Sequence, residues 1–176
     1  MSVLIIILLV LAGIIALLLI AALFMKREHY VKREIVINAP RQKVFDYIKL
    51  LKNQDKFNKQ AIADPDRDKE FKGTDGTVGF IIAWNGDKSV DEGEKEIMNI
   101  IEGKKIETEI RFVRPFRAVG RAIMETGSVA DDQTKVSWSN AGTLKYPINM
   151  MIPMLEKNVA KDMDISLSTL KNILEN

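Results

Sequence analysis

Between Glu70 and Leu144 the sequence alternates apolar and polar residues over several segments that are joined by short turns and not by helices. The turn signals are Asp75-Gly76, Asn85-Gly86-Asp87, Glu102-Gly103-Lys104 and Asp131-Asp132. Asp-Gly and Asn-Gly favour tight hairpins because both central residues tolerate a positive φ. Since a period of two places every second side chain on one face of a strand, this stretch predicts an antiparallel sheet with one apolar and one solvent-exposed face.

The residues expected on the apolar face share one parity within each segment. They are Val78, Phe80, Ile82, Trp84, Ile106, Thr108, Ile110, Ala118, Gly120, Ala122, Met124, Val136, Trp138 and Asn140. The small residues Ala118, Gly120 and Ala122 either leave room for a ligand or let a helix approach closely, and both alternatives stay open. The two tryptophans add bulk and one N–H donor each, and plain core residues of this kind are common.

A helix that begins at Pro147 and runs to Leu174 is expected to cover this apolar face. Its stripe at three- and four-residue steps consists of Leu155, Val159, Met163, Leu167, Leu170 and Leu174. Such a stripe is typical of a helix packed on a sheet. Met150, Met151 and Met154 near its start indicate either a cavity mouth or a loosely packed core, because methionine fills irregular gaps.

The segment before the sheet predicts one strand and short helices. Val31 to Ile37 alternates as a strand with Val31, Arg33, Ile35 and Ile37 on one side, and Asn38-Ala39-Pro40 ends it. Val44, Tyr47, Ile48 and Leu51 then recur at helical spacing after the proline. Residues 52–68 predict a second helical turn and a loop.

Val3 to Met25 is an apolar run of 23 residues without a charge. As a helix it would measure about 34 Å, enough for a hydrocarbon core of ~30 Å. A cleaved signal peptide is the alternative, but its apolar core would be ~7–15 residues long and would follow a basic start. We therefore expect a single transmembrane helix, and the basic residues that follow it predict a cytoplasmic domain in the cell membrane.

The charge distribution separates the chain into three parts. Residues 26–33 carry a net charge of +3 and the rest of the domain carries −1. We expect residues 1–25 to form the transmembrane helix, residues 26–33 a basic juxtamembrane segment and residues 34–176 one folded domain. Nucleic acid is not an expected partner, because such binding needs a broad basic face. Protein partners are not specified.

The residue types for catalysis and metal binding are few. The chain contains no cysteine and one histidine, His29, which we expect beside the membrane and outside the domain's interior. No catalytic residue, metal site or cofactor is therefore assigned. The remaining candidates for a general base are Glu94, Glu96, Tyr146 and Asp46, provided that one of them is turned into an apolar pocket.

The order of these elements resembles the START-like helix-grip superfamily, in particular its SRPBCC polyketide cyclase/dehydrase and lipid-transport family. The matching segments are 35–40 followed by 44–48, then 71–79, 84–86, 93–97, 112–116 and 134–138. One departure is Lys95, where similar proteins usually carry an apolar residue, and the side of the sheet that Lys95 faces is left open. The resemblance covers about residues 30–176.

The resemblance implies an α+β helix-grip fold, in which a seven-stranded antiparallel sheet wraps around the long C-terminal helix and a cavity between them holds an apolar molecule. The residues expected to line it are Phe80, Ile82, Trp84, Thr108, Ile110, Gly120, Ala122, Met124, Trp138, Asn140, Met151 and Leu155. The expected function is a membrane-anchored, non-catalytic binding module for a hydrophobic small molecule or lipid. A polyketide cyclase/dehydratase-like enzyme with a membrane-soluble substrate and a ligand-free interaction domain are the alternatives.

Overall fold

The computed structural model describes residues 2–64, 67–85, 92–114 and 116–176, and it has the α+β helix-grip architecture expected from the sequence. Its helices are α1 (Val3–Phe24), α2 (Arg41–Lys49), α3 (Leu51–Gln54), α4 (Lys59–Ala63) and α5 (Ile152–Glu175), the last preceded by the 3₁₀ helix η1 (Ile148–Met151). Its strands are β1 (Glu28–Ile37), β2 (Asp68–Lys72), β3 (Ile81–Asn85), β4 (Glu92–Ile101), β5 (Lys105–Arg114), β6 (Ala118–Ala130) and β7 (Gln133–Thr143).

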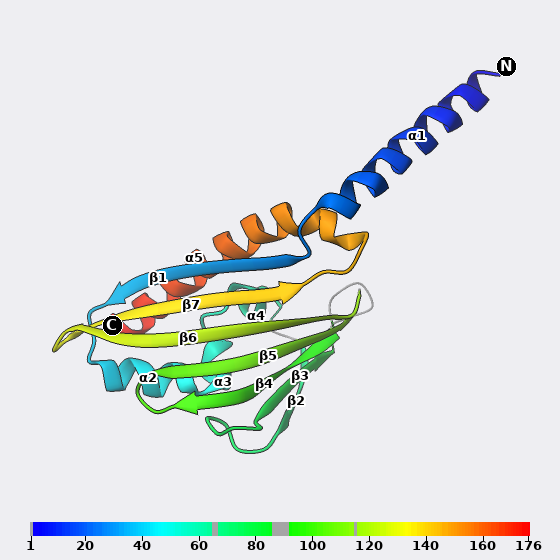
Figure 1. Ribbon diagram of the computed structural model, residues 1–176. Coiled ribbons are helices and arrows are strands. Elements are labelled where there is room, and N and C mark those ends of the chain that lie inside the picture. The colour runs from blue at the N-terminus through cyan, green and yellow to red at the C-terminus, as the bar shows by residue number, and fades with distance from the viewer. Residues whose placement is uncertain (1, 65–66, 86–91, 115) are drawn as a thin grey trace.

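The seven strands form one antiparallel sheet in the order β1-β7-β6-β5-β4-β3-β2. The expected turns at Asp75-Gly76, Glu102-Gly103-Lys104 and Asp131-Asp132 connect neighbours in sequence, and Gly76 and Gly103 adopt positive φ values of 79° and 65°. The turn predicted at Asn85-Gly86-Asp87 lies beyond Asn85, outside the described residues. The first strand, β1, forms one edge of the sheet and pairs with the last strand, β7, so that Ile35 lies opposite Val136. The long sheet curves over the C-terminal helix (Figure 1).

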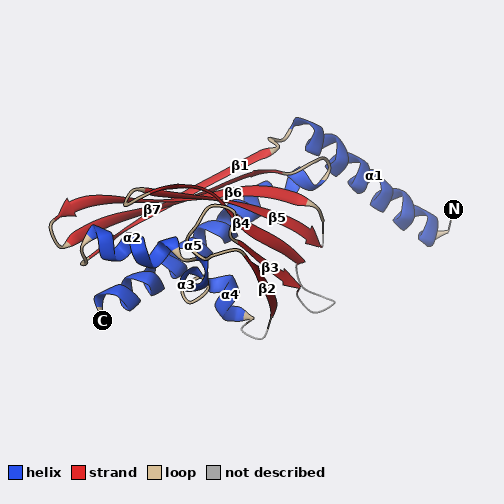
Figure 2. Cartoon of the chain, turned by 90° about the horizontal axis from the view of Figure 1, so that it is seen from below, coloured by secondary structure: helices blue, strands red, loops and turns tan. Residues whose placement is uncertain are grey.

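Helices α2 to α5 gather on one face of the sheet, which we call the inner face, and leave the other, outer face to solvent (Figure 2). The predicted stripe on α5 is confirmed, because Met163, Leu167, Leu170 and Leu174 are buried in the core. Phe45, Ile48 and Phe57 from the short helices and the loop after them complete it. The backbone of α5 lies closest to β1, at one edge of the sheet. Between the central strands and the helices, the space on the inner face is therefore filled by side chains.

Helix α1 projects away from the sheet and is exposed over nearly its whole length (Figure 1). It is long and apolar enough to cross a membrane, and its length and position fit both an anchor and a signal sequence. Its C-terminal end touches the rest of the chain through Asn149 of η1. The Asn149 amide donates hydrogen bonds to the carbonyl oxygens of Ala22, at 2.7 Å, and Met25, at 3.2 Å.

Two strand boundaries differ from the sequence-based prediction. Strand β1 begins at Glu28 and not at Val31, so part of the basic segment pairs with β7. Strand β3 begins only at Ile81, and Val78 is 61% exposed in the turn before it, so the assignment of Val78 to the inner face was wrong. The reason is that Gly73, Gly76 and Gly79 all adopt positive φ, which turns the chain where alternation predicts a strand.

Candidate functional site

The expected ligand-lining residues divide into a packed group and a half-exposed group. Phe80, Ile82, Thr108, Ala122, Met124 and Trp138 are buried, and four of them belong to the hydrophobic core with α5. Trp84, Ile110, Gly120, Asn140 and Leu155 are half-exposed, and we call these five residues the α1-side strip. Met151 lies in η1 and is 42% exposed. Solvent thus reaches the inner face along the α1-side strip and not in the packed half.

The α1-side strip lies towards the end of the sheet from which α1 departs. Strands β1, β4 and β6 begin and strands β3, β5 and β7 end there, and η1 leads into α5 at the same end (Figure 1). An open hollow of about 1110 Å³ lies at this end, mostly on the outer face, where Tyr30, Arg111 and Arg121 line it, and it reaches the inner face only at His29, Phe112, Ala118 and Gly142. The half-exposed residues of the inner face therefore lie at the end of the sheet next to α1.

Gly120 provides free space in the middle of this strip. A Cβ atom added to it would meet only the carbonyl oxygen of Ala141, at 3.4 Å, which is ordinary contact. Its neighbours across the sheet are Ile110 on β5 and Gly142 on β7, so the free space is local to Gly120. Of the two alternatives for the small residues, close approach of a helix does not apply at Gly120.

His29 lies on the inner face, so the expectation that its side chain stays outside the domain's interior was wrong. It is 9% exposed, and its Nε2 lies 3.0 Å from Oδ1 of Asn140. The ring covers Gly142, where a Cβ atom would come within 2.6 Å of His29 Cε1. His29 has the parity of Val31, which was the signal for this orientation.

Lys95 also points to the inner face, which the sequence left open. It has the parity of the buried Ile97 and pairs across the sheet with Ile82 and Ile110. Its amine donates a hydrogen bond to Oε1 of Gln54 at 2.5 Å. Burial lowers the pKa of the Lys95 amine to about 8, and the nearby Asp55 carboxylate opposes that shift.

Three described side chains of the inner face carry a buried ring nitrogen without a hydrogen-bond partner. The ring nitrogens Trp84 Nε1, Trp138 Nε1 and His29 Nδ1 are buried and have no hydrogen-bond partner among the described residues. All three side chains belong to inner-face positions. An apolar ligand with a few polar groups fits such a surface, because binding sites of this kind combine apolar walls with a few polar atoms.

The two carboxylates considered for general-base chemistry lie on the outer face. Glu94 and Glu96 flank Lys95 on β4 and both bind Arg111, at 2.6 Å and 2.5 Å. Their attraction and that of Glu109 raise the pKa of the Arg111 guanidinium. Neither carboxylate meets the condition of facing an apolar pocket. The described residues contain no cluster of side chains that could hold a metal ion.

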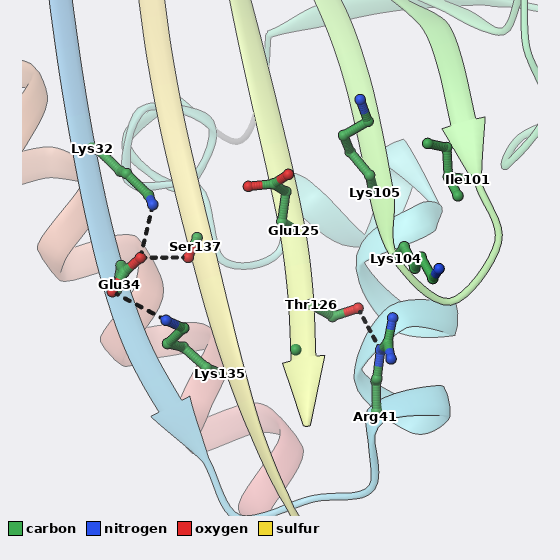
Figure 3. Close-up of a pocket in the computed structure, with 11 residues that line it drawn as sticks. Lys32, Glu34, Arg41, Ile101, Lys104, Lys105, Glu125, Thr126, Lys135 and Ser137 are labelled. Atoms are coloured by element: carbon green, nitrogen blue, oxygen red, sulfur yellow. Dashed lines mark hydrogen bonds and ion pairs between the residues drawn. The ribbon is translucent and has the colours of Figure 1, made fainter. Parts of the chain in front are cut away.

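A second hollow, of about 550 Å³, lies on the outer face between the sheet and the start of α2 (Figure 3). It is an ion-pair surface: Glu34 accepts a hydrogen bond from Ser137 at 2.7 Å and lies 2.9 Å from the Lys32 amine and 3.7 Å from that of Lys135. The Ser137 hydroxyl and the Lys32 amine lower the pKa of Glu34 to about 2. Glu34 is thus matched by its neighbours, whereas the basic side chains that line the hollow outnumber its two carboxylates, Glu34 and Glu125.

In comparisons of sequence, no protein-family model and no curated protein matches this chain. Solved structures share its fold. The protein CV1439 from Chromobacterium violaceum is 13% identical with a TM-score of 0.61, over 84% of this chain and 98% of that one. Truncated norcoclaurine synthase from Thalictrum flavum is 12% identical with a TM-score of 0.61, over 85% and 95%. Ara h 8.0201 is 15% identical with a TM-score of 0.57, over 84% and 97%. Residues 28–176 thus have the START-like helix-grip fold.

Proposed function

We propose that this chain is a membrane-anchored binding module for a hydrophobic small molecule or lipid and that it performs no chemistry on its ligand. The observation that carries this proposal is the half-exposed α1-side strip, an apolar surface with free space at Gly120 in the otherwise packed sheet–helix layer. Apolar surface left open inside a folded domain is typical of a ligand site. Phe80, Thr108 and Met124 are buried in the packed half of the same inner face.

The position of the strip supports a ligand that comes from a bilayer. We infer that α1 is a single-pass anchor and that residues 26–176 are cytoplasmic, because the basic residues follow the apolar helix. The half-exposed residues of the inner face lie at the end of the sheet next to α1, so a membrane-soluble molecule would have a short path to them. Membership of the SRPBCC lipid-transport family is part of this proposal.

One structural neighbour supports a binding role for the fold. Norcoclaurine synthase from Thalictrum flavum, in a complex with dopamine and hydroxybenzaldehyde, is 10% identical with a TM-score of 0.60, over 88% of this chain and 90% of that one. That protein holds two small aromatic molecules. We do not propose a synthase activity for this chain, since Glu94 and Glu96, the carboxylates considered for a base here, face outward and pair with Arg111.

The test is a comparison of the molecules that co-purify with the full chain in mild detergent, identified by mass spectrometry of a solvent extract. Gly120→Phe would fill the free space on the inner face, whereas Gly127→Phe adds the same side chain to the outer face of the same strand. We expect an apolar molecule with the wild type and with Gly127→Phe, and its loss with Gly120→Phe. Equal recovery from all three proteins, or from none, would contradict the proposal.

A further inference from the structure

Lys95 brings a positive charge to the apolar inner face. Its neighbours across the sheet are Ile82 and Ile110, and the next inner-face residue on its own strand is the buried Ile97. The residue keeps some contact with solvent, whereas its amine is desolvated enough for burial to lower the pKa to about 8. At pH 7 the amine is therefore still mainly protonated.

No carboxylate in the described part of the chain forms an ion pair with this amine. Its partner is the neutral amide of Gln54, whose Nε2 donates to the carbonyl oxygen of Ile48 at 2.8 Å and so fixes Oε1 towards Lys95. Asp55 is the nearest carboxylate in sequence to that contact, but it lies 2.9 Å from the amine of Lys69. A desolvated charge is normally paired, so the Lys95 ammonium can still accept an anionic partner.

Two other cationic side chains near the inner face are matched within the described part of the chain. Arg33 of β1 pairs with Asp164 of α5, and Arg67 pairs with Asp64. Arg67 also lies over the ring of Trp84, with 5.8 Å between its guanidinium carbon and the ring centroid. An anion that reaches the inner face beside Ile110 thus meets an ammonium, that of Lys95, which forms no ion pair with a carboxylate of the described residues.

The route from Lys95 to the strip follows neighbouring strands. Ile110 of β5 stands beside Lys95, and Gly120 of β6 stands beside Ile110. Because strands are about 4.8 Å apart, the free space at Gly120 begins about 10 Å from the Lys95 backbone. That distance suits one molecule with a polar head at Lys95 and an apolar tail over Ile110 and Gly120.

We propose that the ligand of this site is an amphiphile with a carboxylate head, which pairs with the Lys95 ammonium while its acyl tail covers Ile110 and Gly120. The inference rests on the proposed function and specifies the chemical class of its ligand. A carboxylate adds the attraction of a full negative charge, which the neutral Gln54 amide that accepts from Lys95 in the free protein does not supply.

The test uses the full chain in phosphatidylcholine nanodiscs and two probes, palmitic acid with a diazirine in its acyl chain and the methyl ester of the same molecule. After photolysis, mass spectrometry quantifies the label on β5 and β6. We expect the acid to label these strands about tenfold more than the ester at pH 7, the size of effect that one charge-assisted bond supplies. Labelling that persists in Gly120→Phe is background from the bilayer.

Two substitutions isolate the amine. Lys95→Met should remove the preference for the acid and leave labelling by the ester, whereas Lys95→Arg should keep the preference. Raising the pH to 10 should abolish the preference in the wild type and not in Lys95→Arg, because arginine stays protonated. The other groups facing this region are Asp55, Lys69, Arg67 and Tyr47, and burial raises the pKa of Tyr47 above its usual value of 10.0. All four groups are present in both the wild type and Lys95→Arg, so their titration does not distinguish the two proteins.

The outcomes separate this inference from the proposed function. Equal labelling of the inner face by acid and ester, or a preference that survives in Lys95→Met, overturns the carboxylate head but leaves apolar binding in place. If neither probe labels the wild type more strongly than Gly120→Phe, both the carboxylate head and the proposed function are refuted. Thermal unfolding of each variant, followed by tryptophan fluorescence, establishes that the compared proteins are folded.

Discussion

Replacing Lys95 with methionine should make the ligand-free protein more stable at neutral pH. The difference between the ordinary lysine pKa of 10.5 and about 8 in the folded chain corresponds to about 3 kcal/mol against the charged form, at 1.36 kcal/mol per pH unit. Methionine has a similar length and no charge to desolvate. It leaves Oε1 of Gln54 without its partner, which costs about 1–2 kcal/mol. The net gain at pH 7 is therefore about 1–2 kcal/mol.

The sign of the pH dependence follows from the lowered pKa. Because the unfolded chain binds the lysine proton more tightly than the folded chain, wild-type stability rises as the pH increases from about 8 towards 10.5. Between pH 7 and pH 9.5 the wild type should gain about 2 kcal/mol relative to Lys95→Met. The other titrating groups are the same in both proteins, so the difference between them isolates Lys95.

The assay is urea unfolding of the full chain in mild detergent, followed by the fluorescence of Trp84 and Trp138. Lys72→Met, which removes an exposed lysine from β2, is the control and should change neither the stability nor its pH dependence. If Lys95→Met unfolds at lower urea than the wild type at pH 7, or if the gap between them stays constant up to pH 9.5, the reasoning about an unpaired, desolvated amine is refuted.

Three further predictions concern topology, folding and packing. Protease added outside intact cells should spare residues 26–176; digestion there, detected by immunoblot, would reverse the proposed orientation. Deleting residues 1–25 should leave a domain with cooperative thermal unfolding, since β1 begins at Glu28, whereas deleting residues 155–176 should abolish it because the sheet loses its covering helix. Gly142→Ala should lower stability by about 1–3 kcal/mol, because the new methyl displaces His29. Gly127→Ala, which meets no atom within 4 Å, is its control, and equal melting temperatures would contradict the clash.

Local periodicity predicted the sheet and the helix that covers it, but it could not specify contacts between distant segments. Alternation predicted the inner face of β5 to β7 correctly because no glycine turn interrupts those strands. It failed at Val78, since three glycines with positive φ convert the same pattern into a turn. The fold could be predicted from these local patterns alone. The candidate site could not, because the orientation of its residues depends on partners that local patterns do not specify.

The charged run on β4 illustrates that limit. Glu94, Lys95 and Glu96 are consecutive, so charges occupy both parities and alternation has no apolar residue to follow. The orientation is decided by partners elsewhere: Arg111 on β5 holds both glutamates on the outer face, and Gln54 on α3 receives the lysine. His29 was misplaced because its burial depends on register with Gly142, 113 residues later in the chain.

The short connection between α1 and the sheet limits how far the domain can travel. Helix α1 ends at Phe24 and β1 begins at Glu28, and three residues span about 10 Å at most. The bonds from Asn149 to the carbonyl oxygens of Ala22 and Met25 remove even part of that freedom. In the proposed membrane-anchored arrangement, a domain with so short a connection stays at the leaflet in which α1 ends. Delivery to a second membrane would require that membrane, or a soluble acceptor, to approach within contact distance.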